Sequence, residues 1–139
     1  MLRKGGLLYS ERPAGLLRKP GRFTPKNAGA YYLAGYCIEC AIKACIAKQV
    51  KRFEFPDKDL ANQAWSHDLE KLIGIAGLKQ ALQEDMKVNS AIELNWAIIK
   101  DWKESYRYEL KITKSQATDF YLACSDQTNG ILDWIEKRW

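Results

Sequence analysis

Four side chains near the start of the sequence have residue types and spacing suited to ligand chemistry. Tyr32, Tyr36, Glu39 and Lys43 follow one another at intervals of four, three and four residues. In a helix these intervals place all four side chains on one face. A lysine on such a face can meet a phosphate, and a tyrosine can stack on a base or a sugar. The pattern predicts a nucleotide-binding face.

The charged pair on this face also has a structural interpretation. Glu39 and Lys43 are four residues apart and can form an ion pair that closes a polar gap in an otherwise apolar helix. A buried charge is costly unless it is paired, so it indicates pairing more often than ligand binding. We expect the partners of this pair to be Tyr106, Arg107 and His67.

His67 is the single histidine of the chain. It is a candidate general acid or base, together with Arg107 and Glu39, if the three side chains converge within hydrogen-bond reach. Because it follows Ser66, which is an expected N-cap, it can instead bond the turn at a helix start. We favour the structural role, and no catalytic residue is assigned beyond His67 as a possibility.

The cysteines at positions 37, 40, 45 and 124 invite a metal or redox interpretation. However, no turn residue separates Cys37, Cys40 and Cys45, and a second pair of zinc ligands is missing. Free cysteine behaves as a small hydrophobic residue. We therefore expect small buried cysteines in a core helix, with no metal, no cofactor and no disulfide framework.

The elements that must position these residues are all predicted to be helices. We expect an all-α fold, an antiparallel up-and-down helical bundle of four principal helices plus short helices. The principal helices are expected at 27–51, 67–76, 89–106 and 113–137, and the short ones at 57–64 and 79–87.

Three glycines qualify this prediction. Gly77 is expected to stop the helix before it, and Gly130 is a weak point within residues 113–137. Gly35 is expected to permit the close approach of a neighbouring helix. The helix at 27–51 is apolar on nearly every side, which is typical of a central, buried helix.

Length and composition indicate one globular domain. The chain has 139 residues, of which 47% are hydrophobic and 28% charged, with a net charge of +5. Residues 1–26 contain seven basic residues and one acid, whereas the rest contains 15 basic and 16 acidic residues. We expect a basic, largely irregular leader at 1–26 and a bundle at 27–139. The leader is either a solvated tail, which we favour, or a segment that attracts RNA or DNA.

The sequence also carries expectations about location and assembly. No apolar run is long enough for a signal-peptide core or approaches a membrane span, so we expect a cytoplasmic protein without a membrane partner. Trp134 and Trp139 lie at the end of the chain, where little core is available to cover them. They favour a homodimer.

Three segments, in order, resemble HEPN domains, which are small helical-bundle proteins. Ala30-Tyr-Tyr-Leu-Ala-Gly-Tyr-Cys-Ile-Glu-Cys-Ala-Ile-Lys43 resembles the second-helix signature of the family. Ser66-His-Asp-Leu-Glu-Lys-Leu72 is similar to its His-Asp-Leu helix start, and Trp102-x-x-x-Tyr106-Arg107-Tyr108 to its tryptophan and Arg-Tyr end. The resemblance runs from about residue 28 to the C-terminus.

The resemblance implies an up-and-down bundle, often dimeric, with a role related to nucleotides or RNA and, in many members, a small nucleotidyltransferase as partner. Ribonuclease members use an Arg-x4-6-His motif. Here the nearest arginine before His67 is Arg52, and no histidine follows Arg107. That activity is therefore not carried over.

We accordingly expect a non-catalytic HEPN module of a toxin–antitoxin or defence type. It would bind a nucleotide or RNA, or a nucleotidyltransferase. The ligand-binding residues expected from the sequence are Tyr32, Tyr36, Glu39, Lys43, Tyr106 and Arg107. The alternatives are a divergent RNase or nucleotide-processing enzyme and a purely structural oligomerisation domain.

Overall fold

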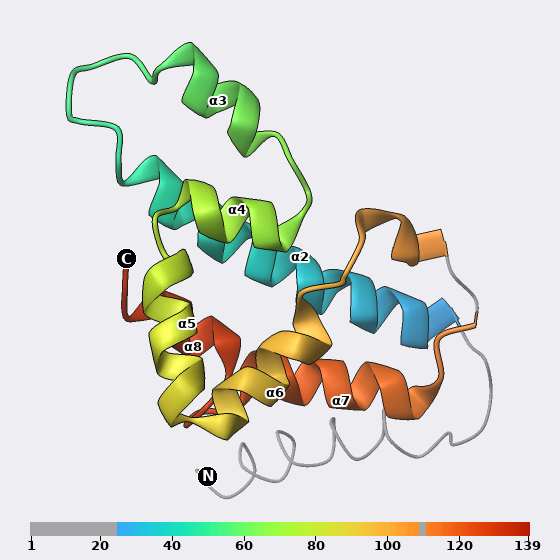
Figure 1. Cartoon of the computed structure of the whole chain (residues 1–139). Helices are drawn as coiled ribbons and strands as arrows, with labels where there is room; N and C mark the ends of the chain where they lie inside the picture. The colour runs from blue at the N-terminus through green and yellow to red at the C-terminus, as the bar shows by residue number, and fades with distance from the viewer. Residues whose placement is uncertain (1–24, 109–110) are drawn as a thin grey trace, which may run out of the picture.

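The computed structural model describes residues 25–108 and 111–139, apart from the side chains of Pro25, Arg107 and Tyr108. Over this part of the chain the fold is all-α, with seven α-helices, one 3-10 helix and no strand (Figure 1). The predicted all-α class is confirmed. The expected irregular leader lies outside the described residues, except for its last two positions, which already belong to the first described helix.

Helix α2 is the longest element, and the later helices gather around it (Figure 1). The elements are α2 (Pro25–Ala47), α3 (Lys58–Ala64), α4 (Leu69–Ile75), α5 (Lys79–Val88), α6 (Ser90–Ile99), η1 (Glu104–Tyr108), α7 (Lys114–Ser125) and α8 (Ile131–Glu136).

Two of the predicted principal helices are each divided. The helix expected at 89–106 ends at Ile99, where the Trp102 N–H donates to the Ile99 carbonyl at 3.0 Å and turns the chain toward η1. The helix expected at 113–137 is interrupted between Ser125 and Ile131. Gly130 fits the tight turn between the two parts, where a Cβ would overlap the backbone of Asp126. The arrangement of four principal helices stays a prediction.

Other boundaries shift by a few residues. Helix α2 ends at Ala47 rather than at residue 51. Asp68, not Ser66, caps α4, since its carboxylate accepts the N–H of Lys71 at 3.1 Å. The expected stop at Gly77 is present, with φ +73°, a left-handed conformation that glycine adopts without strain.

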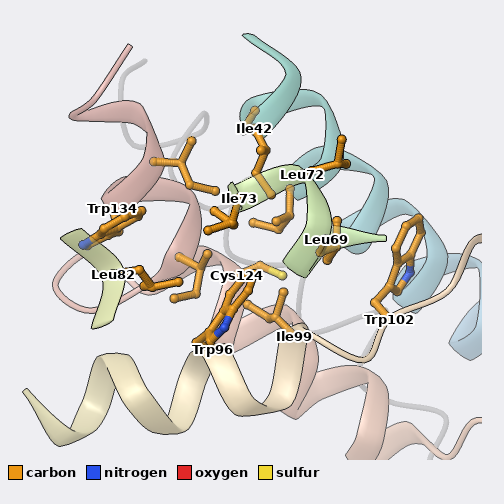
Figure 2. Close-up of a cluster of buried hydrophobic side chains, with 14 of the residues drawn as sticks. Ile42, Leu69, Leu72, Ile73, Leu82, Trp96, Ile99, Trp102, Cys124 and Trp134 are labelled. Atoms are coloured by element: carbon orange, nitrogen blue, oxygen red, sulfur yellow. The ribbon is translucent and has the colours of Figure 1, made fainter. Parts of the chain in front are cut away.

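The core lies where α2, α4, α6, α7 and α8 converge (Figure 2). Periodic apolar residues supply it: Ile38 and Ile42 from α2, Leu69 and Leu72 from α4, Ile99 from α6, Phe120 from α7, and Ile131 and Ile135 from α8, each with no exposed surface. Burial of one such side chain contributes roughly 1.5–3 kcal/mol. This core fixes the face of α2 that the other helices cover.

None of the other described helices covers the opposite face of α2, and here two expectations are wrong. The helix is not buried on every side, and Cys37 and Cys40 are exposed, whereas Cys45 and Cys124 are buried as expected. The reason is packing: α4, α7, α8 and η1 cover less than the full circumference of α2. Apolar composition could not indicate which side would stay open.

Helix α2 also corrects the expectation about membrane spans. By length and composition alone, Lys26–Ala47 is apolar enough to cross a membrane, and it is the one such helix among the described residues. Core helices of soluble proteins pass the same test, and 39% of its most apolar window is buried. In this fold α2 is a core helix with a buried carboxylate, Glu39. A cytoplasmic location stays a prediction.

The homodimer stays a prediction, and of the two tryptophans that favoured it Trp134 no longer does. Trp134 is buried in the core, so it does not need a partner chain to cover it. Trp139 is 54% exposed, and its indole N–H donates to the Ala41 carbonyl of α2 at 3.3 Å. The terminal ring therefore lies on α2, next to the uncovered face.

Candidate functional site

A buried carboxylate lies at the centre of the candidate site. Glu39, on α2, is 2% exposed. Among the described residues, no other charged residue is buried. Its Oε1 accepts from Lys43 Nζ at 2.7 Å, one turn further along the helix, and lies 2.9 Å from His67 Nδ1. Pairing offsets part of the cost of burying the charge. The ion pair predicted from the sequence is present, and one of its three expected partners, His67, contacts it.

Local structure between α3 and α4 positions His67. The Ser66 hydroxyl accepts the N–H of Asp68 at 3.1 Å, and Asp68 in turn caps α4. These two short hydrogen bonds turn the chain sharply and leave His67 just outside the helix. The imidazole then meets Glu39 across the space between α4 and α2.

The second ring nitrogen of His67 also meets a carboxylate. Nε2 lies 2.9 Å from Oε2 of Glu104, in η1. Ionised carboxylates only accept hydrogen bonds, and a neutral imidazole has one N–H. Both contacts are therefore hydrogen bonds at once only when the ring carries two protons. Contacts link Lys43 to Glu39, Glu39 to His67 and His67 to Glu104, and we call these four residues the Glu39 cluster.

A surface depression opens beside this cluster. Its volume is about 380 Å³, and its lining includes the aromatic rings of Tyr36 and Trp65 together with Lys43 and His67. Glu39 also lines the depression. Trp65 is 80% exposed at the end of α3, so its indole presents a free aromatic surface to solvent. The depression combines aromatic rings with hydrogen-bonding groups of both signs.

The buried polar atoms of this region are not all satisfied. Oε2 of Glu39 and Nε1 of Trp102 are buried and have no hydrogen-bond partner among the described residues. Trp102 occupies the space above Gly35, where a Cβ would overlap the indole ring. The close approach predicted at Gly35 is thus present, but it is made by a tryptophan side chain rather than by a neighbouring helix.

Two predicted site residues lie away from the depression. The ring of Tyr32 stacks on that of Tyr36 with 6.0 Å between centroids, yet Tyr32 faces Trp102 on its other side. Tyr106 packs edge-on against Tyr31 at 5.5 Å and lines a different depression. The expectation that Tyr106 would join Glu39 is therefore wrong, because the 3-10 turn of η1 directs it toward α7.

Arg107 has a described backbone within η1, but its side chain lies outside the described part of the structure. Its predicted role in ligand binding stays a prediction.

The cysteines show no metal-binding arrangement. Among the described residues no group of three or more His, Cys, Asp and Glu side chains could hold a metal ion. Burial raises the pKa of the Cys124 thiol to about 12 and also raises that of Cys45. The exposed Cys40 raises the pKa of Tyr36, mainly through its charge and a hydrogen bond. The buried thiols are therefore neutral at ordinary pH.

The sequence analysis did not predict a role in this region for two residues, Glu104 and Trp65. Glu104 was missed because nothing in a 3-10 turn indicates where its side chain points. Trp65 was assigned no role, although a tryptophan directly before the expected helix cap at Ser66 was a usable signal.

Comparison of the chain with family models, with curated proteins and with solved structures finds no significant match.

Proposed function

We propose that this chain is a non-catalytic module of HEPN type that binds a nucleotide or a short single strand of RNA beside the Glu39 cluster. One observation carries the proposal: Tyr36 and Trp65 line the same depression as Lys43 and His67. Aromatic faces accept bases of any sequence, and each stacked base contributes about 1–3 kcal/mol. The resemblance of the sequence to HEPN domains supports the same class of ligand.

The charges of the site favour a ligand with few phosphates. Lys43 is paired with Glu39, and His67 with Glu39 and Glu104. Because Lys43 is already paired with a carboxylate, we expect stacking to contribute more to affinity than phosphate binding does. Lys43, 30% exposed, retains N–H donors for one phosphate. We therefore expect affinity to depend weakly on salt.

A divergent RNase is the second candidate function, and the Glu39–His67 contact of 2.9 Å favours it. A carboxylate that orients an imidazole is a common general-base arrangement. However, the other ring nitrogen is occupied by Glu104, so a substrate would have to displace that carboxylate. We expect labelled RNA to stay intact with the wild type. Cleavage that His67→Ala abolishes would replace the binding proposal by this one.

A nucleotidyltransferase partner, in a toxin–antitoxin or defence pair, is the cellular setting that the resemblance supports. An adjacent gene for a small nucleotidyltransferase, and its co-purification with this chain, would support this part of the proposal. Their absence would leave the module without that partner.

Isothermal titration calorimetry with mononucleotides and short RNA oligomers tests the binding proposal. Lys43→Ala and Trp65→Ala are each expected to lower the affinity about tenfold, which corresponds to about 1.4 kcal/mol. Lys137→Ala is the matched control, since Lys137 also pairs with an acid four residues before it, at 2.8 Å, but follows the end of α8 and does not line the depression. Flat titrations with every ligand, or equal losses in the control, would refute the proposal.

The basic leader can contribute to RNA binding by electrostatic attraction, and the same titrations distinguish this contribution from stacking. Residues 1–24 contain six basic residues and one acid, so their net charge of +5 equals that of the whole chain. If RNA binds electrostatically, deletion of this segment should remove most of the salt dependence. Stacking in the depression should persist in the shortened protein.

A further inference from the structure

Another surface depression lies between α4 and α5. Only three residues join these helices, yet α4 packs on α2 and α3 while α5 packs on α6, so the two diverge instead of covering one another (Figure 1). The depression has a volume of about 420 Å³, a size that small organic ligands occupy. It shares no lining residue with the depression beside the Glu39 cluster, and we call it the α4–α5 groove.

Core residues form the apolar floor of the groove. Ile73 of α4, Leu82 of α5 and Trp96 of α6 line it, and each is buried. Met86, one turn after Leu82 on α5, adds a flexible thioether that adapts to ligands of different shape. Because the core already orders three of these four side chains, an apolar ligand meets a surface that is largely preformed.

The floor contains one polar group without a partner. Trp96 is 5% exposed, and its indole N–H has no hydrogen-bond partner among the described residues. The N–H of Trp134, in contrast, donates to Asp85 at 2.7 Å. The N–H of Trp96 is also not fully enclosed, as that of Trp102 is, so an acceptor in the groove can reach it. Buried donors are normally paired, and this one therefore indicates a ligand that supplies an acceptor.

Two lysines lie at the rim of the groove, one on each helix. Lys71 of α4 and Lys79 of α5 are exposed, and neither forms an ion pair within the part of the chain that the structure describes. The amide of Gln83 can donate a further hydrogen bond. Glu70 lines the groove as well, but it also lines a depression beside His67 and so lies between the two. The rim carries a net charge of about +1, which favours an anionic ligand.

We propose that the α4–α5 groove binds a small carboxylic acid that carries an apolar group. The apolar group lies on the floor, and the carboxylate accepts hydrogen bonds from Lys71, Lys79 and the indole N–H of Trp96. Two carboxylate oxygens have about four lone-pair sites, enough for these three donors. One negative charge matches the rim, whereas a phosphate dianion would exceed it. This site is separate from the proposed nucleotide site.

Isothermal titration calorimetry of the full chain with octanoate tests the binding. We expect saturable binding at one site, and we expect acetate and octan-1-ol to bind at least tenfold more weakly. Acetate lacks the apolar group and octan-1-ol lacks the charge. Failure of octanoate to saturate a site would overturn the proposal, and so would octan-1-ol that binds as tightly as octanoate.

The lysines are tested together, in a protein with both Lys71→Ala and Lys79→Ala. Its affinity for octanoate should fall at least tenfold, because the charge-assisted bonds are lost. Lys87→Ala is the matched control, since Lys87 is an exposed and unpaired lysine of α5 that does not line the groove. An unchanged affinity of the double variant would overturn the proposal, as would an equal loss in the control.

Gly74 offers a way to block the groove. It lines the groove, and a Cβ at this position would meet nothing within 4 Å. Gly74→Leu should therefore weaken octanoate binding at least tenfold without lowering the melting temperature. Gly29→Leu is its control, because the position is equally open but lies on α2, outside the groove. Full octanoate binding by a folded Gly74→Leu protein would contradict the location of the site.

Nuclear magnetic resonance of the indole N–H groups locates the ligand in the wild type. Octanoate should shift the resonance of Trp96, which Trp96→Phe assigns, and should leave that of Trp134, bonded to Asp85, in place. Equal shifts at both would indicate partition into the core and would overturn the proposal. Adenosine monophosphate should not displace octanoate. Competition between the two would assign them to one site and overturn the separate groove, whereas failure of nucleotide binding alone would leave it standing.

Discussion

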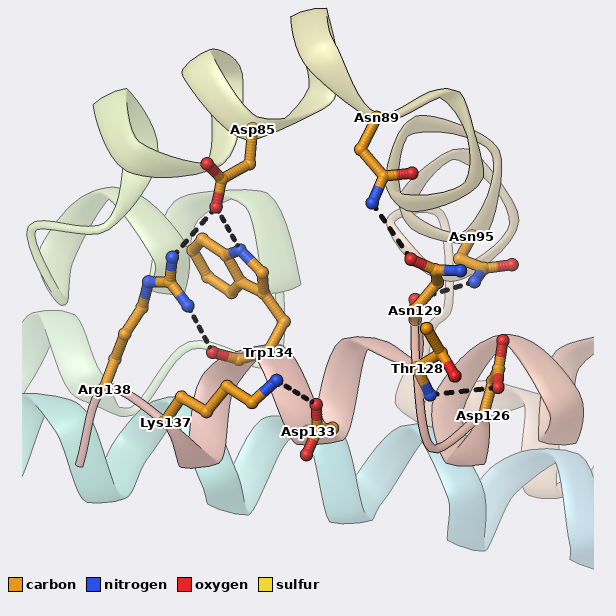
Figure 3. Close-up of polar contacts among 10 residues, drawn as sticks. All are labelled: Asp85, Asn89, Asn95, Asp126, Thr128, Asn129, Asp133, Trp134, Lys137 and Arg138. Carbon is orange, nitrogen blue, oxygen red and sulfur yellow. Dashed lines mark hydrogen bonds and ion pairs between the residues drawn. The ribbon is translucent and has the colours of Figure 1, made fainter.

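Two polar clusters of this protein use similar residue types in different ways. In the Asp85 clamp, which comprises Asp85, Trp134 and Arg138, Oδ2 of Asp85 accepts from Trp134 Nε1 at 2.7 Å and from Arg138 Nη2 at 2.9 Å (Figure 3). Arg138 also donates to the Trp134 carbonyl and lies 3.7 Å above the Trp134 ring. The clamp joins α5 to α8 and leaves no aromatic face or buried donor open to a ligand.

The Glu39 cluster differs in what it leaves unsatisfied. One buried oxygen of Glu39 has no partner among the described residues, and the cluster opens onto a depression with two aromatic rings. A polar network that serves stability alone is expected to satisfy each buried group. The comparison indicates that the clamp stabilises the fold, and it supports the proposal that the Glu39 cluster binds a ligand.

The largest expected effect comes from breaking the clamp. Asp85→Ala leaves the buried indole N–H of Trp134 unpaired and removes a charge-assisted bond to Arg138, a loss of about 3 kcal/mol in the free energy of unfolding. Urea denaturation measures this loss, and nucleotide binding should be unchanged. Lost binding with unaltered stability would contradict the division of roles.

The next effect tests how the fold supports the Glu39 cluster. Gly35→Ala forces the ring of Trp102 away from α2, at a cost of about 2 kcal/mol for overpacking. Tryptophan fluorescence should change, and the melting temperature should fall. Gly29→Ala on the same helix is the control: a Cβ there meets nothing within 4 Å, so stability should rise by up to about 1 kcal/mol.

A smaller effect, of opposite sign, is expected at the buried carboxylate. Lys43 and His67 are 30% and 45% exposed, so both can turn to solvent when the buried charge is removed. Glu39→Leu then saves the cost of burying a carboxylate and should raise the free energy of unfolding by about 0–1 kcal/mol. Ligand affinity should fall in the same protein. A large loss of stability would instead assign the Glu39 cluster to the same structural role as the clamp.

The smallest effect at neutral pH concerns Tyr31 and Cys124, two groups that lose their protons only in alkali. Burial is the main cause of both shifts: it raises the pKa of Tyr31 from 10.0 to about 12 and that of Cys124 from 9.0 to about 12. The folded state holds these protons more tightly than the unfolded state does. Their contribution is complete below about pH 9 and is lost as the pH rises toward 12. Circular dichroism should show alkaline unfolding that Tyr31→Phe shifts to higher pH.

Local sequence signals predicted much of the fold. The all-α class, α3, α5 and the stop at Gly77 follow from short-range rules on apolar period, caps and glycine. The breaks after Ile99 and at Gly130 were not predicted, although residues 113–137 contained a warning at Gly130. Both breaks let a later segment pack on the core, and packing overrides local helix preference.

For the candidate site, the spacing of residues along one helix predicted a contact correctly. The sequence did not predict which residues of different helices would meet. The i,i+4 pair of Glu39 and Lys43 is present, because both residues belong to one helix. The contact with His67 was named as one possibility among three, and Tyr106, named beside it, lies elsewhere. Glu104 was not anticipated at all.

By itself the sequence determined which residues share a face of α2, because helical geometry is local and repeats every 3.6 residues. It did not determine which faces the other helices would cover. Only the tertiary structure decided that Glu39 is buried beneath His67 while Cys37 and Cys40 face outward. A helix that is apolar on all sides carries no local signal for its own orientation. The neighbouring helices decide which faces of α2 are buried, and they thereby decide where the depression lies.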